Sequence, residues 1–197
     1  MTDTRNTPNS PAKSNNKTVM ICMCAVFTAL TAVGAFIRIP IPVVPFTLQY
    51  PITMLAGIIL GGRYGAASVG AYVVLGLLGV PIFTEGGGLY YIFKPSFGYL
   101  IGFIIGTYVT GKIANAVKNP SYKRILAANF AGMGIVYALG LIHCYIVSNY
   151  WVGGTPIGVW ALILHCFLLV VPGDIAFCFL GTLIGKRLIP ITSKYRR

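Results

Sequence analysis

The chain has 197 residues and a formal net charge of +12, with 56% hydrophobic residues and only 9% charged residues. Soluble domains carry about 25% charged residues, so this composition excludes an ordinary soluble protein. The basic residues lie between long apolar runs instead of forming one patch, which argues against a nucleic-acid partner. Long unbroken apolar runs predict membrane-spanning helices, whereas a β-barrel would show alternating segments of about ten residues.

The chain opens with residues 1–17, which are rich in Asn, Thr, Ser and Pro and predict a disordered tail. Six apolar segments follow, and the second, after Pro51, ends near Gly61–Gly62. It is short for a span of about 20 residues, so it either extends backwards through residues 46–49 or is partly re-entrant. The other five are residues 19–37, 65–78, 97–116, 125–147 and 157–184, the last interrupted at Pro172–Gly173. We therefore predict an all-α, six-helix membrane domain over residues 18–189, followed by a basic tail at 190–197.

The positive charges predict the orientation of these helices. With six spans both ends of the chain lie on one side, and thirteen of the fifteen lysines and arginines then fall on that side. Arg38 and Lys94 are the two on the opposite side. Loops rich in Lys and Arg stay in the cytoplasm, so we expect a multi-pass protein of the cell membrane with both termini cytoplasmic.

Two outer connections, residues 38–49 and 79–95, are unusually apolar and rich in Pro or Gly. Irregular apolar backbone is tolerated at membrane depth where protein covers it or where it lines a cavity. We expect these loops to fold over the outer end of the bundle as a lid on a ligand. The alternative is a plain connection whose aromatic side chains form an interfacial belt.

Asp174 is one of three acidic residues and follows Pro172–Gly173 inside the last apolar segment. A carboxylate at this depth is costly unless it is paired or hydrogen-bonded, so the default interpretation is contact with a ligand or an ion. The alternative is a helix N-cap that accepts from orphan backbone N–H groups.

Other polar and aromatic residues fall near the same outer end. A pocket needs an apolar lining with a few convergent polar groups, and this set could hold a small, flat molecule with an anionic group. A lysine or arginine would face the anion, and Asp174 would accept from N–H donors. The constellation is Asp174, Glu85, Lys94, Arg38, Gln49, Tyr91 and Tyr99.

The first span carries a second signal, since Ala25 and Ala29 are four residues apart and share one helix face. Small residues at this spacing let two helices approach closely in lipid. The strip either receives a partner helix or packs within the bundle.

Motifs of enzymes are missing from the sequence. It contains no HExxH, GxSxG or P-loop motif and no paired carboxylates, so we expect neither catalysis nor a cofactor or metal. The five cysteines form no CxxC pair, and His143 and His165 are isolated, which favours structural roles. A substrate-binding subunit of an importer, a stand-alone secondary transporter and a membrane enzyme are the classes considered, in that order.

Several runs resemble the BioY family, the biotin-binding S components of energy-coupling factor (ECF) transporters. They follow one another with fitting spacing from about Thr18 to Lys186. The runs are Pro45-Phe46-Thr47-Leu48-Gln49, Leu55-Ala56-Gly57-Ile58-Ile59-Leu60-Gly61, Gly76-Leu77-Leu78-Gly79-Val80-Pro81-Ile82-Phe83, Gly98-Tyr99-Leu100-Ile101-Gly102-Phe103, Tyr137-Ala138-Leu139-Gly140 and Pro172-Gly173-Asp174.

The resemblance implies biotin uptake with a transmembrane coupling subunit, which would dock on Ala25 and Ala29, and two ATPase subunits. Phe177 stands where the family usually has a lysine, and Lys94 replaces the glycine of its Gly-Pro-Thr-Gly-Gly-Tyr run. Lys94 would therefore bind the anionic group of the ligand in place of that lysine, or the ligand would be a related acid such as lipoate. The implied ligand contacts are Asp174, Lys94, Gln49, Tyr91, Tyr99, Gly87, Gly88, Glu85, Arg38 and Tyr137.

Overall fold

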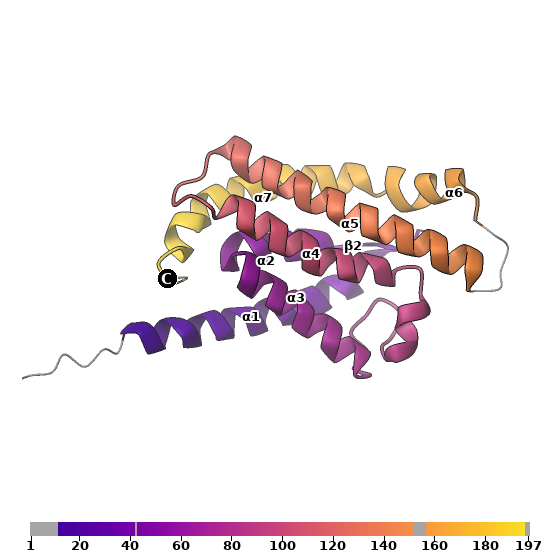
Figure 1. Cartoon of the computed structure of the whole chain (residues 1–197), viewed down its shortest axis with the longest axis horizontal. Helices are drawn as coiled ribbons and strands as arrows, with labels where there is room; N and C mark the ends of the chain where they lie inside the picture. The colour runs from indigo at the N-terminus through magenta and orange to yellow at the C-terminus, as the bar shows by residue number, and fades with distance from the viewer. Residues whose placement is uncertain (1–11, 42, 152–156, 196–197) are drawn as a thin grey trace, which may run out of the picture.

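The computed structural model describes residues 12–41, 43–151 and 157–195 (Figure 1). Helices make up nearly all of it, with one two-stranded antiparallel pair near the N-terminal end. The elements in chain order are α1 (Ala12–Phe36), β1 (Arg38–Ile39), β2 (Phe46–Thr47), α2 (Gln49–Leu60), α3 (Gly62–Leu77), η1 (Leu89–Phe93), α4 (Phe97–Ala114), α5 (Tyr122–Tyr150), α6 (Val159–Ile163), η2 (Leu164–Leu168) and α7 (Val171–Thr192).

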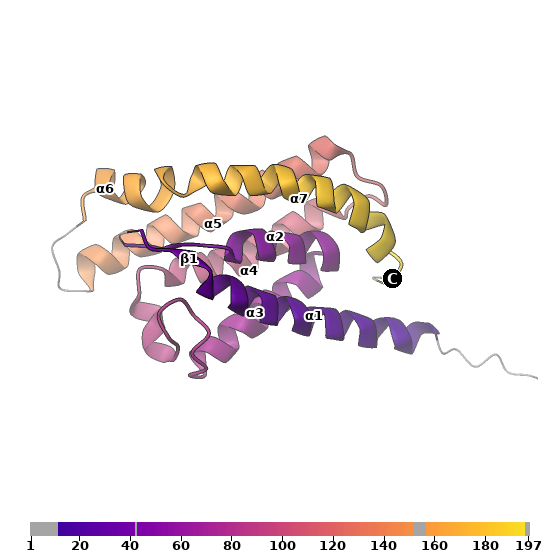
Figure 2. The same cartoon turned by 180° about the vertical axis from the view of Figure 1, so that it is seen from behind.

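The helices form one bundle in which α4 and α5 pack along each other most extensively. Small residues permit this close approach, because a side chain at Gly102 would press on the backbone of Val136 and one at Gly132 would clash with Thr110. On one side of this pair, α7 packs against α2 and α5. On the other side, α1 packs against α2 and α3 (Figures 1 and 2).

The predicted segments correspond to these helices, with α6, η2 and α7 together forming the sixth. In the described residues four helical stretches are long and apolar enough to cross a membrane, within α1, α4, α5 and the α6–α7 stretch. Helix α2 has 12 residues, which gives a length of about 18 Å against a bilayer core of about 30 Å. It does not extend back to residue 46, because Phe46 and Thr47 pair with β1. The helix begins at Gln49, so the backward extension through residues 46–49 reaches only the last of these four residues.

Three predicted boundaries differ from the structure. Helix α1 begins at Ala12, so residues 12–17 are helical, while residues 1–11 of the expected tail lie outside the described residues. Extending an existing helix costs little, because each added residue brings a hydrogen bond. The last segment is irregular before Pro172, at the π-helical turn η2, and Pro172 lies in the first turn of α7, where its missing N–H needs no partner. Helix α7 also runs on to Thr192, into the expected C-terminal tail.

The loops at one end of the bundle pack over it, as predicted. The strands β1 and β2 connect α1 to α2, and the loop containing η1 connects α3 to α4 (Figures 1 and 2). Phe83 of the second loop is buried against the ring of Tyr72, with centroids 5.4 Å apart, and Gly76 leaves the space that the Phe83 ring occupies. Arg38 of β1 donates a hydrogen bond to the carbonyl of Thr84, which joins the two loops.

Candidate ligand-binding site

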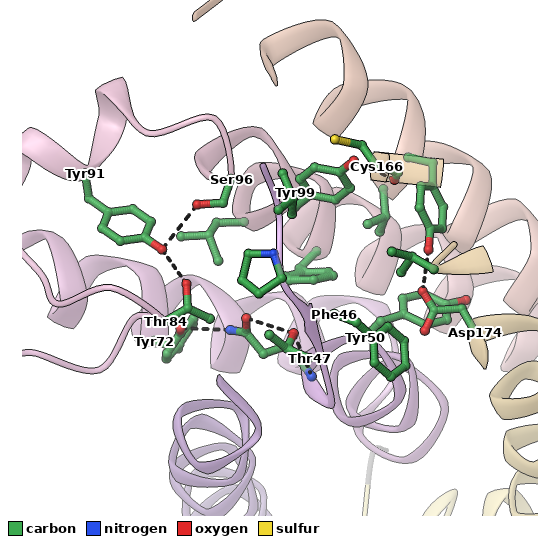
Figure 3. A pocket seen from close by; sticks show the side chains of 18 residues that line it. Phe46, Thr47, Tyr50, Tyr72, Thr84, Tyr91, Ser96, Tyr99, Cys166 and Asp174 are labelled. Carbon is green, nitrogen blue, oxygen red and sulfur yellow. Dashed lines mark hydrogen bonds between the residues drawn. The ribbon is translucent and has the colours of Figure 1, made fainter. Parts of the chain in front are cut away.

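A cavity lies between these loops and the helices α2, α3, α4, α5 and α7 (Figure 3). Its wall is mainly apolar and aromatic, with a few polar groups at separate places, as in small-molecule sites generally. The lining residues are Val44, Pro45, Phe46, Thr47, Gln49, Tyr50, Tyr72, Thr84, Tyr91, Ser96, Tyr99, Leu100, Phe103, Val136, Tyr137, Cys166, Val170 and Asp174.

Asp174 lies on the inner face of the first turn of α7 and is buried, with 4% of its surface exposed. Its Oδ2 accepts a hydrogen bond of 2.7 Å from the Tyr137 hydroxyl on α5. Its Oδ1 is buried without a hydrogen-bond partner. Neither oxygen accepts from a backbone N–H, so the predicted N-cap alternative is wrong. A buried acceptor of this kind is costly, which makes it the natural partner of a donor on a ligand.

Aromatic packing fixes the position of Tyr137. The ring of Tyr99 meets that of Tyr137 edge-on, with centroids 6.1 Å apart. Tyr99 lies flat on α5 because Gly140 has no side chain there, and its hydroxyl donates to the carbonyl of Cys166 at 3.1 Å. Cys166 belongs to η2, so the irregular turn before α7 supplies an anchor for the cavity wall.

A group of hydroxyls lies at another part of the cavity, with Phe46 between it and Asp174 in Figure 3. The Tyr91 hydroxyl is 2.7 Å from Thr84 Oγ1 and also accepts from Ser96 Oγ at 3.3 Å. Tyr91 is buried in η1, and its ring packs on Phe83 with centroids 4.4 Å apart. We call Thr84, Tyr91 and Ser96 the hydroxyl pole.

Gln49 lies beside the hydroxyl pole, at the start of α2. Its Nε2 donates to the Tyr72 hydroxyl at 2.8 Å, and its Oε1 accepts from Thr47 Oγ1 at 3.3 Å. Tyr72 in turn donates to the carbonyl of Ile82 at 3.1 Å, which ties the η1 loop to α3. Gln49 thus orders the loops and lines the cavity at once.

Of the predicted binding residues, five line the cavity: Asp174, Gln49, Tyr91, Tyr99 and Tyr137. Lys94 and Glu85 do not, because they pair with each other at 2.8 Å, with side chains 38% and 41% exposed. The hydrogen bond to the Glu85 carboxylate raises the pKa of Lys94 above its ordinary value. Arg38 is exposed and bonds Thr84 instead of lining the cavity.

Gly87 and Gly88 shape the loop and are outside the lining. The Gly88 N–H donates to the Gly76 carbonyl at 2.7 Å, and its φ of 102° is unfavourable for other residues. A side chain at Gly87 would collide with the carbonyl of Val80. The two glycines therefore let the loop fold tightly against α3.

Sequence reasoning missed several lining residues, above all Tyr72, Thr84 and Ser96. Their positions in the chain gave only weak signals: Tyr72 lies within an apolar span, and Thr84 and Ser96 are ordinary loop residues. The one sequence signal for Tyr72 was a polar hydroxyl within an apolar helix.

Ala25 and Ala29 lie on the exposed side of α1, away from its contacts with α2 and α3. The opposite side is held by Thr28, whose hydroxyl donates to the carbonyl of Ser68 on α3 at 2.8 Å. The alternative that this strip packs within the bundle is therefore wrong.

The two histidines lie beside backbone carbonyls. Among the described residues there is no group of three His, Cys, Asp or Glu side chains able to hold a metal. His143 Nε2 lies 3.2 Å from the carbonyl of Ile92 in η1, and His165 Nδ1 lies 2.8 Å from that of Ala161.

Comparison with known proteins shows which family has this sequence and fold. The model of the BioY family matches residues 6–194. A "Probable biotin transporter BioY" of Lysinibacillus sphaericus is 41% identical over 178 residues, which are 88% of each chain. A "Biotin transporter BioY" of Thermotoga maritima is 44% identical over 64% of this chain and 72% of its own. The crystal structure of an S-component for biotin from an ECF-type ABC transporter superposes with a TM-score of 0.65, at 30% identity, over 88% of this chain and 92% of that one. With a family match over nearly its whole length and a matching solved fold, this chain belongs to the BioY family.

Proposed function

We propose that this protein is the substrate-binding membrane subunit of an ECF-type importer and that its substrate is biotin. Support comes from the relatives named as biotin transporters and from the solved S-component for biotin. The relatives are named as transporters, so we infer a transport role and no enzymatic one.

The observation that carries the proposal is the free acceptor of Asp174. Biotin has a bicyclic head with two N–H donors and a tail that ends in a carboxylate. The unpartnered Oδ1 of Asp174 would accept from one N–H, and the aromatic wall formed by Tyr99, Tyr137 and Phe46 would enclose the rings. The head of lipoate has no N–H donor and would leave this buried oxygen without a partner. Biotin is thus favoured over the related acid lipoate.

The source of energy lies in other chains. The sequence contains no nucleotide-binding motif, so we infer a separate transmembrane coupling subunit and two ATPase subunits. The ends of the described chain and the connection from α4 to α5 lie at one end of the bundle, opposite the loops around η1 (Figure 1). Their lysines and arginines favour a cytoplasmic location for both termini, which puts the cavity near the outer surface.

Direct binding tests this proposal. Purified protein in detergent or nanodiscs is expected to bind biotin in isothermal titration calorimetry and to show no heat of binding with thiamine or riboflavin. Mass spectrometry of small molecules that co-purify gives an independent reading. Lipoate binding without biotin binding would replace biotin as the substrate, and binding of neither acid would contradict the proposal.

Lys94 offers a sharper test of the site. Because Lys94 pairs with Glu85 outside the cavity, we expect Lys94→Ala to change biotin affinity by less than about fivefold, in line with the 0–1 kcal/mol typical of exposed ion pairs. Glu85→Ala is the matched control, since it breaks the same pair from the other side. A far larger loss for Lys94→Ala, absent in Glu85→Ala, would mean that Lys94 leaves Glu85 and binds the ligand.

A further inference from the structure

Among the residues that the structure describes, one charged side chain lines the cavity, and it is the acid Asp174. Figure 3 draws all 18 lining residues, and none is a lysine, arginine or histidine. Phe177, at the position where a cation was expected from the resemblance, is also outside the lining. A ligand carboxylate therefore meets no cationic side chain among the described residues of the cavity wall.

The two cations of the covering loops are engaged by the protein itself. Lys94 donates to the Glu85 carboxylate at 2.8 Å, and Arg38 donates to the carbonyl of Thr84. The Lys94–Glu85 pair lies within the second loop, and the Arg38–Thr84 hydrogen bond joins the two loops. Turning either cation inward would break its existing contact.

The hydroxyl pole is suited to a neutral partner. Each hydroxyl of Thr84, Tyr91 and Ser96 can both donate and accept a hydrogen bond. It can thus serve a carboxylate, an amide or an alcohol by rotating one O–H bond. A cationic site would discriminate strongly among these three groups, and a group of hydroxyls does not.

Electrostatics favours the neutral forms further. A charge removed from water is costly unless it is paired. The described lining residues include no cation that could pair with an anionic tail. An anionic tail would therefore be buried unpaired, whereas an amide or an alcohol brings no charge.

We propose that the site recognises the tail of its ligand by uncharged hydrogen bonds at Thr84, Tyr91 and Ser96, and that it therefore accepts neutral amide and alcohol derivatives of the ligand acid as well as the acid. This inference rests on the proposed function, because it takes the ligand head to be held at Asp174. It extends the substrate class from an acid to its uncharged derivatives.

Calorimetry with three matched ligands tests the inference. Biotin, its primary amide and its primary alcohol are titrated into the full-length protein at neutral pH, at low and high salt. The amide and the alcohol are expected to bind within about threefold of biotin or more tightly, with little effect of salt, since no ion pair is made. Biotin binding with an amide more than about tenfold weaker would overturn the inference and leave the proposed function intact. Failure of biotin itself to bind would overturn the proposed function.

Substitution of two adjacent tyrosines tests whether the ligand tail binds at the hydroxyl pole. Tyr91 is buried in the hydroxyl pole, whereas Tyr90 is 73% exposed and lies outside the cavity lining. Tyr91→Phe is expected to weaken the acid and the amide equally, by roughly 2- to 10-fold, as for the loss of one hydrogen bond. Tyr90→Phe is the matched control and is expected to leave both affinities unchanged. If Tyr91→Phe weakened only the acid, or neither ligand, the tail would not be bound by uncharged hydrogen bonds at this pole.

Discussion

Replacing Asp174 by asparagine is expected to lower biotin affinity about 5- to 150-fold, which corresponds to roughly 1–3 kcal/mol for a mispaired buried group. The Tyr137 hydroxyl donates to Oδ2 of Asp174, so an asparagine would turn its amide oxygen toward Tyr137. Its NH2 group would then replace Oδ1 on the ligand side. Two hydrogen-bond donors, this NH2 group and the ligand N–H, would face each other without an acceptor. Calorimetry of the folded variant measures the loss.

A second variant separates this explanation from a general loss of structure. Tyr137→Phe removes the donor that fixes the orientation of residue 174. In the double variant Asp174→Asn, Tyr137→Phe the amide can rotate and offer its oxygen to the ligand, so we expect the double variant to bind more tightly than Asp174→Asn alone. Such coupling between contacting residues is what a double-mutant cycle detects. A well-folded Asp174→Asn protein with the affinity of the wild type would show that Asp174 does not meet the ligand.

Replacing Ala29 by tryptophan is expected to abolish biotin uptake by cells while ligand binding persists. Ala29 is exposed on α1, and the N-terminal part of this helix extends beyond the rest of the bundle (Figure 2). If a partner helix packs closely on Ala25 and Ala29, a large side chain would wedge the contact apart. An overpacked contact costs about 1–3 kcal/mol, which corresponds to roughly a 5- to 150-fold loss of complex. Pull-down of the coupling subunit and uptake of labelled biotin measure the effect.

The neighbouring residue provides the control. Leu30 is 42% exposed and lies about 100° further around the helix, beside the strip rather than on it. Leu30→Trp replaces one large apolar side chain by another, so we expect it to leave uptake largely intact. Loss of both binding and uptake in Ala29→Trp would mean that the substitution damages the bundle. Normal uptake in Ala29→Trp would mean that this face of α1 contacts only lipid.

The sequence by itself determined the membrane class, the approximate helices and the burial of Asp174. Each of these depends on local composition, because a bilayer demands long apolar segments and penalises an isolated charge. The same logic identified residues 38–49 and 79–95 as covering loops, since apolar irregular backbone needs protein around it. The family motifs added Tyr137 on α5, which the structure places against Asp174.

Only the tertiary structure decided which polar residues meet in the cavity. Lys94 and Arg38 are as polar in sequence as Gln49, yet they face Glu85 and Thr84 instead of the cavity. Thr84 and Ser96 gave only weak signals in the sequence, and they come together because the η1 loop folds back on α3 and places Tyr91 between them. The direction of a loop side chain depends on contacts with residues far away in the chain. Local apolar composition therefore predicts the membrane spans well, whereas the pairing of charges and hydroxyls in the covering loops depends on tertiary packing.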